Sequence, residues 1–389
     1  MPKLEAYDTL DIKYRPKFFK DIIGQDRIIN YLKKRLKAGK IPRTIMLHGC
    51  TGVGKTTLAR LIAKYVNCTG ETFACGKCYT CKCKNIKDHV DVHEMNMANA
   101  TSVDDVRNLI SKARYLPRTN FRVYILDELH MCSPQAKECI LKPLEEPPAH
   151  VIWILCTTEI EKFKDTILNR CTSLHLRDVQ PEDLAEYLIT VAEKEKSPLA
   201  QDRELMLDLA YASHACPRES LKLLDSIITH MTTENIKTVD KKKILEFVRD
   251  GNPEQYVINY LMAIYRGSYK EAFTILKETQ KEHKTEYLMR EIIKYHKNIL
   301  YNSIDETLDN RFFVNLTDEY LSAKNKKYHL SRPALAKMLV CMVKAYSEAR
   351  NYLVSVDSLA ASLTVEILDI SREDFIQKAL AQKAKSKKK

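Results

Sequence analysis

Long apolar runs are missing from this sequence. No stretch reaches the roughly 20 apolar residues that a membrane-crossing helix needs. The first residues, Met1-Pro2-Lys3-Leu4-Glu5, also lack the apolar segment of a secretory signal. These two absences argue against membrane and secreted proteins, and we expect a soluble, cytoplasmic protein with no membrane partner.

Glycine is scarce as well, with nine residues in 389. Only Gly251 and Gly267 lie beyond Asp178, and neither a β-rich run nor a solenoid-type repeat appears there. The segment Gln180-Pro181-Glu182-Asp183 has the proline and acidic residues that are typical of the first turn of a helix. The second half of the chain is therefore predicted to be helical.

Acidic residues are fewer than basic ones, 51 against 63, which leaves a formal net charge of +12. Part of the excess lies in residues 379–389, where we expect a disordered basic tail. A basic protein attracts acidic partners, and nucleic acid is the commonest of them. The charge therefore favours a DNA- or RNA-binding protein.

The first 177 residues alternate apolar runs of strand length with helical segments. This alternation is typical of a parallel sheet that helices cover on both faces. The expected strands are Thr44–Leu47, Val92–Met95, Arg122–Leu126, Val151–Leu155 and Ser173–Leu176. With 45% hydrophobic residues, the chain has enough apolar material for two or three such cores.

Two helical units are expected after this α/β unit of residues 1–177. The first covers residues 178–245, and glycine and proline in Arg249-Asp250-Gly251-Asn252-Pro253 mark the break that follows. The second covers residues 250–378 and contains apolar residues at helical spacing, which predict a buried face. These residues are Leu335, Met338, Leu339, Met342, Val343 and Tyr346.

The pattern G-x-x-x-x-G-K-T of a phosphate-binding P-loop follows the first expected strand. Its glycines let backbone N–H groups converge on phosphate oxygens, and the helix N-terminus behind them favours negative charge. Lys55 is expected to reach the β- and γ-phosphates, and the Thr56 hydroxyl to ligate magnesium. The predicted phosphate-binding residues are Gly49, Cys50, Thr51, Gly52, Val53, Gly54, Lys55, Thr56 and Thr57.

A second motif lies further along the chain, where the apolar run Val123-Tyr124-Ile125-Leu126 ends in two acidic residues. A strand of this kind is expected to bring Asp127 to the magnesium ion and Glu128 to the attacking water. Together the two motifs predict that the chain binds and hydrolyses a nucleoside triphosphate.

Twelve cysteines in such a protein favour free thiols and metal ligands over disulfides. Four of them, Cys68, Cys75, Cys78 and Cys81, have spacings that can supply four thiolates to a tetrahedral zinc ion. Zinc is favoured over an iron–sulfur cluster because nothing else in the sequence indicates redox chemistry, although the spacing fits both. Cys83 could replace Cys81 as the fourth ligand. Because four thiolates leave no open position for water, the site is predicted to be structural.

Several further short segments accompany these motifs. They are Lys13-Tyr14-Arg15-Pro16, Asp91-Val92-x-Glu94, Val103-Asp104-Asp105-Val106-Arg107, Asp127-Glu128-Leu129-His130-Met131 and Leu144-Glu145-Glu146-Pro147-Pro148. In this combination, over about residues 10–245, the chain resembles the gamma/tau ATPase subunits of bacterial DNA polymerase III clamp loaders, which are AAA+ proteins. The resemblance implies an AAA+ P-loop α/β domain with a zinc-binding insertion, a small helical lid domain and an all-helical collar domain. The collar resembles the family only in its helical texture.

Some residue roles follow from the resemblance alone. It implies that Tyr14, Arg15 and Pro16 line the adenine pocket, and that Thr157 is the sensor 1 residue beside the γ-phosphate. Arg218 corresponds to the sensor 2 arginine, although the family's glycine three residues before it is Ala215 here.

Arg170 corresponds to the arginine finger of the family, which acts in trans on the ATP of the adjacent subunit. The serine that precedes it in the family is Asn169 here, but the arginine is intact. A trans arginine of this kind is worth about 10³–10⁵ in rate in related NTPases. A surface salt bridge is the alternative role for Arg170.

The function implied is that of a clamp loader motor, which uses ATP to open a sliding clamp and load it onto primer–template DNA for the replicative polymerase. The implied cofactors are ATP, Mg²⁺ held by Thr56 and Asp127, and Zn²⁺; the implied partners include the other clamp loader subunits. A replication factor C-type small subunit is one alternative, against which the Cys68–Cys81 insertion argues. A non-hydrolysing scaffold like delta-prime is another, against which the intact P-loop and acidic residues argue.

Overall fold

Residues 7–70, 74–83, 85–98, 103–213, 215–234, 236, 244, 253–282, 284–304, 330–351 and 355–386 are described in the computed structural model. The chain divides into two compact units, Met1–Val239 and Asp240–Lys389. The domain end expected at residue 245, and all of the expected break except Pro253, lie outside the described residues. Within the described ranges, no helix has both the length and the apolar character that a bilayer span requires.

A parallel sheet forms the centre of the first unit, and in the described part of the chain its strand order is β2-β3-β4-β1-β5. The strands are β1 (Thr44–His48), β2 (Val92–Asn96), β3 (Arg122–Asp127), β4 (Val151–Thr157) and β5 (Thr172–His175). All five expected strands are confirmed, with ends shifted by one or two residues.

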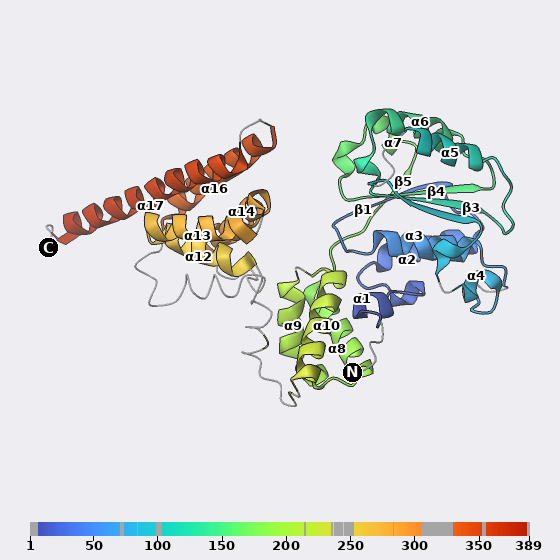
Figure 1. Ribbon diagram of the computed structural model, residues 1–389, viewed down its shortest axis with the longest axis horizontal. Coiled ribbons are helices and arrows are strands. Elements are labelled where there is room, and N and C mark those ends of the chain that lie inside the picture. The colour runs from blue at the N-terminus through green and yellow to red at the C-terminus, as the bar shows by residue number, and fades with distance from the viewer. Residues whose placement is uncertain are drawn as a thin grey trace. The chain divides into compact units, whose positions relative to one another are not determined.

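Helices cover both faces of this sheet (Figure 1). They are α2 (Asp26–Lys37) and α3 (Lys55–Val66) on one face, and α5 (Val103–Lys112), α6 (Pro134–Glu145) and α7 (Asp165–Leu168) on the other. Successive strand residues point to opposite faces. Ile45 and Leu47 therefore pack into the core with α3, whereas Met46 packs into the core with α6.

Short helices and 3-10 turns lie between the longer elements of the first unit. They are α1 (Leu10–Lys13), α4 (Tyr79–Lys82) and the 3-10 turns η1 (Phe19–Asp21), η2 (Ile86–Asp88), η3 (Leu129–Met131), η4 (Ile160–Lys162) and η5 (Pro198–Gln201).

Three helices complete the first unit: α8 (Pro181–Lys194), α9 (Arg203–Ala212) and α10 (Pro217–Thr233). As the sequence predicts, α8 begins with a proline at its first position, after Gln180. The N-terminal segment is tied to these helices by side-chain contacts. The Tyr7 hydroxyl donates to Asp225 (2.6 Å), and Lys13 and Tyr14 both contact the Glu195 carboxylate.

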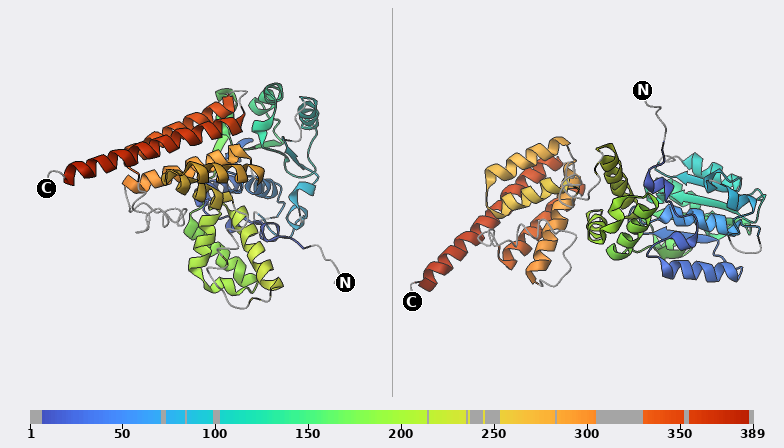
Figure 2. Two further views of the ribbon diagram at one scale, coloured as in Figure 1. Left: turned by 60° about the vertical axis from the view of Figure 1, so that its left-hand side comes forward. Right: turned by 90° about the horizontal axis from the view of Figure 1, so that it is seen from below.

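The second unit is helical in its described residues and has one apolar core. Its helices are α12 (Pro253–Tyr265), α13 (Tyr269–Glu282), α14 (Thr285–Ile304), α16 (Arg332–Asn351) and α17 (Val356–Ser386). Helices α16 and α17 lie side by side (Figures 1 and 2). Because α17 continues to Ser386, residues 379–386 extend this helix instead of forming the separate tail that we expected.

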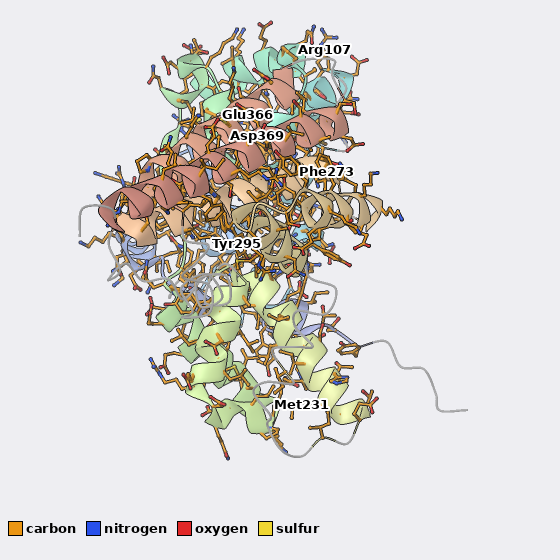
Figure 3. The ribbon with its side chains drawn as sticks, turned by 90° about the vertical axis from the view of Figure 1, so that its left-hand side faces the viewer. Arg107, Met231, Phe273, Tyr295, Glu366 and Asp369 are labelled. Carbon is orange, nitrogen blue, oxygen red and sulfur yellow. The ribbon has the colours of Figure 1, made fainter. Side chains whose placement is uncertain are left out.

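A buried core and hydrogen bonds at the surface of α17 hold this second unit together (Figure 3). Tyr295 lies in the core, while Glu366 and Asp369 of α17 accept hydrogen bonds from Cys341 (3.1 Å) and Tyr269 respectively.

The apolar face expected along α16 is buried at Leu335, Met338 and Met342, but Val343 is 50% exposed. Val343 points about 80° around the helix from Leu335. It therefore lies beyond the edge of the contact with α14 and α17, and its expected burial is wrong.

One buried carboxylate fastens the loop in front of β3. Asp91 accepts hydrogen bonds from the N–H groups of Arg118 (3.0 Å) and Thr119 (2.7 Å) and from the Thr119 hydroxyl (2.8 Å). Burial alone would raise the pKa of Asp91, but these hydrogen bonds outweigh it and lower the pKa below its usual value. The Arg122 guanidinium, 3.7 Å away, adds a favourable charge.

Asp91→Ala is expected to lower the free energy of unfolding by about 3 kcal/mol, because it leaves partly buried N–H groups without acceptors. Since the folded-state pKa is depressed, this stabilisation is present above the unfolded-state pKa, and it disappears as the pH falls through the folded-state value. Urea unfolding at pH 7 and at decreasing acidic pH measures both effects. Asp88→Ala, at an exposed position on η2, is the matched control. Equal stability of the two variants at pH 7 would contradict this role.

Candidate functional site

The glycine-rich loop leaves the carboxyl end of β1 and leads into the N-terminus of α3. A Cβ at Gly49 (φ +147°) would lie 2.3 Å from the Leu176 carbonyl oxygen, and one at Gly52 (φ +76°) would lie 2.3 Å from Cys216 Sγ. Both positions therefore require glycine, for close approach as well as for backbone angle. The loop is thereby packed between β5 and the start of α10, with the helix N-terminus that favours an anion directly behind it.

A cavity of about 450 Å³ opens beside this loop. Four parts of the first unit line it: the N-terminal segment, the loop with α3, the ends of β2 and β3, and helices α8 and α10. The predicted site residues in the lining are Tyr14, Arg15, Pro16, Thr51, Gly52, Val53, Gly54, Lys55, Thr56, Thr57, Asp127, Glu128 and Arg218. A cavity of this size and mixed polarity fits a small-molecule ligand.

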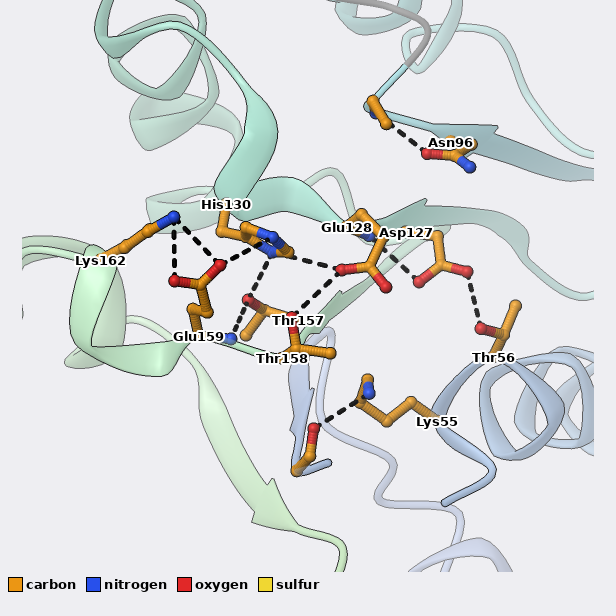
Figure 4. A network of polar contacts seen from close by, with 12 residues as sticks. Lys55, Thr56, Asn96, Asp127, Glu128, His130, Thr157, Thr158, Glu159 and Lys162 are labelled. Carbon is orange, nitrogen blue, oxygen red and sulfur yellow. Dashed lines mark hydrogen bonds and ion pairs between the residues drawn. The ribbon is translucent and has the colours of Figure 1, made fainter. Parts of the chain in front are cut away.

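Lys55 and Thr56 are the first two residues of α3 and face the acidic end of β3 (Figure 4). The Lys55 ammonium donates to the carbonyl oxygens of Gly49 (3.0 Å) and Cys50 (2.8 Å). Burial lowers the pKa of Lys55, and the nearby Glu128 carboxylate opposes this shift. The Thr56 hydroxyl donates to the Asp127 carboxylate at 2.6 Å. This pair of hard oxygen donors fits Mg²⁺.

Glu128 follows Asp127 in a left-handed backbone conformation (φ +53°, ψ +41°), which is uncommon for a residue with a Cβ. Two hydrogen bonds hold the turn: Glu128 N–H donates to Asp127 Oδ1 (3.1 Å), and Met131 N–H donates to the Glu128 carbonyl oxygen (2.9 Å). Because the backbone turns here, Glu128 does not continue the strand, and it lines the cavity.

Thr157, the last residue of β4, is fully buried behind Glu128 and does not line the cavity. Its hydroxyl oxygen accepts the N–H of Glu159 (3.1 Å) and lies 3.2 Å from His130 Nδ1. Gly49 and Cys50 do not line the cavity either. Their carbonyl oxygens accept hydrogen bonds from the Lys55 ammonium.

Arginines gather on the side of the cavity next to β2 and α10. Arg60 makes two 2.6 Å hydrogen bonds to the Glu94 carboxylate, and Arg218 lies 3.6 Å from the Asp11 carboxylate. Burial, together with the charges of Arg60 and Arg218, lowers the pKa of Arg15. Arg60 is not among the site residues predicted from the sequence. Its position one helical turn after Thr56, on the same face of α3, is a signal that could have found it.

Arg170 follows α7, outside the cavity lining. Its guanidinium donates to the Glu145 carboxylate (3.0 Å) and to the Thr166 carbonyl oxygen. These contacts are within its own chain and correspond to the salt-bridge alternative. They hold the guanidinium, which is partly exposed, beside the end of α6.

The four predicted metal-ligating cysteines converge. The sulfur atoms of Cys68, Cys75, Cys78 and Cys81 all lie within 4.8 Å of one another. Cys83 does not join them, because its thiol donates to the Asn85 carbonyl oxygen (3.1 Å). The choice between Cys81 and Cys83 is thus decided by the packing.

The local electrostatics of the cluster favour a thiolate. Burial opposes ionisation of Cys78, but hydrogen bonds from backbone N–H groups and neighbouring thiols lower its pKa to about 6. Burial instead raises the pKa of Cys81 to about 12. Without a cation the four sulfurs cannot all ionise at such distances, whereas a bound divalent ion removes this conflict. The donor set therefore fits zinc.

The sequence of this chain is similar to those of known DNA polymerase III subunits. The family described as "DNA polymerase III, delta subunit" matches residues 24–180. The DNA polymerase III subunit gamma of Buchnera aphidicola subsp. Acyrthosiphon pisum is 32% identical over 277 residues, which cover 69% of this chain and 74% of that protein. The tau/gamma subunit of Haemophilus influenzae and the tau subunit of Escherichia coli are each 34% identical, over 68% and 69% of this chain. The matches span only 38% and 44% of those two longer relatives.

A solved structure of RuvB from Thermotoga maritima aligns with 66% of this chain and 81% of its own length, with a TM-score of 0.50 and 18% identity. At that identity the likeness concerns the fold alone, and it agrees with the predicted AAA+ P-loop domain. The fold class expected from the sequence is confirmed: a parallel-sheet AAA+ domain with a cysteine-rich insertion, followed by helices. By its similarity to the gamma and tau subunits, this chain belongs to the DNA polymerase III gamma/tau family.

Proposed function

We propose that this chain is the ATP-hydrolysing motor subunit of a clamp loader. It acts in the cytoplasm during DNA replication, opening a sliding clamp and loading it onto primer–template DNA for the replicative polymerase. Family membership supports the assembly, and the cavity supports the chemistry. The single observation that carries the proposal is the 2.6 Å hydrogen bond from Thr56 to Asp127, because it joins a magnesium-binding pair beside Lys55 and Glu128.

ATP binding uses groups from both sides of the cavity. The N–H groups of the glycine-rich loop and of the α3 N-terminus hold the phosphates. Lys55 exchanges its two carbonyl partners for phosphate oxygens, and Arg218 adds a guanidinium from α10. Tyr14, Arg15 and Pro16 lie in the same cavity lining, which suits them to contact the base and ribose.

Hydrolysis requires a positioned water and compensation of the charge that develops on the γ-phosphate. Thr56 and Asp127 would hold Mg²⁺, and the ion would neutralise charge on the phosphate oxygens. Glu128 orients the attacking water and accepts its proton. Thr157 supports this region from β4, and Arg170 of a neighbouring subunit completes the site of its partner.

The remaining parts serve assembly and stability. The helical region of residues 178–245 is proposed as a lid, and that of residues 250–378 as the collar through which clamp loader subunits associate. The cysteine cluster holds one structural zinc ion. DNA is bound through its phosphates, so that affinity falls with salt and is independent of sequence.

Glu128→Gln is expected to lower the rate of ATP hydrolysis by about 100-fold or more, because water activation is lost. The Kd for ATP should stay at the wild-type value, since the phosphate-binding groups remain. Phosphate release in the assembled complex with clamp and primed DNA measures the first quantity, and titration with a fluorescent ATP analogue measures the second. Lys55→Ala should instead lose ATP binding, because it removes a phosphate-binding charge. If Glu128→Gln hydrolyses ATP as fast as the wild-type protein, Glu128 has no part in the proposed mechanism. If clamp and DNA do not raise the rate of ATP hydrolysis by the wild-type protein, the motor role is contradicted.

Protein purified without chelators is expected to contain one zinc ion per chain. Cys78→Ser should lose the metal and unfold at a lower temperature, because zinc binding is coupled to local folding. Cys83→Ser is the matched control and should retain both zinc and stability, since Cys83 lies outside the cluster. Elemental analysis and thermal melting test both variants. A zinc-free wild-type protein would refute the structural zinc site.

Arg170→Ala is expected to leave ATP binding by its own subunit intact and to lower hydrolysis at the adjacent subunit by about 10³-fold or more. Arg107→Ala removes an exposed arginine that is paired with Asp104 and serves as the control. Mixed assemblies supply the sharpest measurement. In these assemblies a Lys55→Ala subunit with an intact Arg170 lies beside an Arg170→Ala subunit with an intact P-loop. We expect ATP hydrolysis only at the interface where the intact P-loop meets the intact Arg170. If Arg170→Ala matches wild type in the full complex, the salt-bridge role replaces the trans role.

A further inference from the structure

His130 lies between the carboxylates of Glu128, which lines the cavity, and Glu159 (Figure 4). It belongs to η3, the turn that follows β3, and its side chain is only 6% exposed. Its Nδ1 atom lies 3.2 Å from Glu128 Oε2, and its Nε2 atom lies 3.2 Å from Glu159 Oε1. The ring thus bridges the proposed water-activating residue and a residue just beyond the end of β4.

The partners of this ring are unusual for a buried structural histidine. His296, in the core of the second unit, has a Tyr265 hydroxyl at Nδ1 (2.7 Å) and the Leu335 carbonyl oxygen at Nε2 (2.8 Å). One hydroxyl and one acceptor suit a neutral imidazole, which has a single N–H group. His130 differs from it in having a carboxylate oxygen near each nitrogen, while the Thr157 hydroxyl also lies 3.2 Å from Nδ1. The ring therefore joins two acidic side chains, Glu128 on one side and Glu159 on the other.

Other contacts define the orientation of the Glu128 side chain. The Thr158 hydroxyl donates to Glu128 Oε2 (3.5 Å), the same oxygen that His130 contacts. The Oε1 atom has no hydrogen-bond partner among the described residues, and Glu128 lines the cavity. One carboxylate oxygen is therefore fixed from behind, while the other is left for a water molecule.

Glu159 is held in turn from its far side. The Lys162 ammonium lies 2.9 Å from Glu159 Oε2, and the Glu159 N–H donates to the Thr157 hydroxyl (3.1 Å). The contacts run without interruption from Lys162 through Glu159 and His130 to Glu128. Lys162 closes η4, which precedes α7 and then Arg170 in the sequence.

We infer that His130 is a positioning residue that holds the Glu128 carboxylate for reaction, and that Glu159 acts on Glu128 through His130. The inference rests on the proposed role of Glu128. A misplaced catalytic group lowers the rate without weakening ground-state binding of the substrate. The effect of this network should therefore appear in kcat and not in the Kd for ATP.

Two substitutions separate the ring nitrogens. His130→Asn keeps an amide N–H near the Nδ1 position, toward Glu128, and removes the link to Glu159. His130→Gln keeps a donor near the Nε2 position, toward Glu159, and removes the one at Glu128. In the assembled complex with clamp and DNA, we expect His130→Gln to lower kcat about tenfold or more, while His130→Asn retains most of it. Both variants should bind a fluorescent ATP analogue and melt like wild type. Wild-type kcat in His130→Gln, or equal loss in both variants, would overturn the inference.

A double-mutant cycle tests the route through the ring. Glu159→Gln should lower kcat in the wild-type background by the same small factor as His130→Asn, and it should have no further effect in His130→Asn, where the link is already cut. Glu161→Gln, an exposed glutamate on η4, should leave kcat unchanged in both backgrounds. A Glu159→Gln effect that persists in His130→Asn would show that Glu159 acts independently of His130.

The Glu128→Gln variant distinguishes failure of the proposed role of Glu128 from failure of the inference about His130. If it hydrolyses ATP like wild type, the proposed role of Glu128 fails, and the inference about His130 fails with it. If it loses hydrolysis while His130→Gln does not, only the inference about His130 is wrong.

Discussion

The parallel alignment of β1, β3 and β4 is the constraint on which the candidate site depends. In a parallel sheet the carboxyl ends of the strands lie along one edge, so residues distant in the sequence meet there. The register pairs His48 at the end of β1 with Thr157 at the end of β4, and Leu126 of β3 with Leu155 of β4. The glycine-rich loop, the acidic pair and Thr157 therefore share one edge. The Thr56–Asp127 hydrogen bond joins the helix that follows β1 to the end of β3.

A site that gathers this many charges needs a rigid support. The central strand β4 is buried along its whole length, and the cores on the two sheet faces pack against different helices. Such close packing keeps the strand ends at fixed separations. Pairing of opposite charges, such as Arg60 with Glu94, offsets part of the cost of burying the arginines near Lys55. The left-handed turn at Glu128 is the kind of local strain that a well-packed sheet can hold.

The cavity is completed by segments outside the sheet. Arg218 comes from α10, and Tyr187 of α8 donates to the carbonyl oxygen of Tyr14 in the N-terminal segment (3.0 Å). Arg218 also faces Asp11 from that segment. A ligand that contacts both the loop and Arg218 stabilises this arrangement relative to one in which they lie farther apart, because its affinity for the two arrangements differs. This is a physical basis on which binding of a ligand in the cavity can influence α10.

Short-range patterns were sufficient to predict the strands, the glycine-rich loop, the acidic pair and the four cysteines. Each depends on residues close together in the sequence, such as an apolar run or the spacing of two thiols, which specify the local backbone. The spacing left Cys81 and Cys83 equivalent, and only packing separated them, since Cys83 turns to the Asn85 carbonyl oxygen. The exposure of Val343, the pairing of Arg60 with Glu94 and the place of His130 between Glu128 and Glu159 could likewise not be predicted from the sequence. Each results from the register and packing of elements that are separate in the chain, and no local pattern specifies the distance between them.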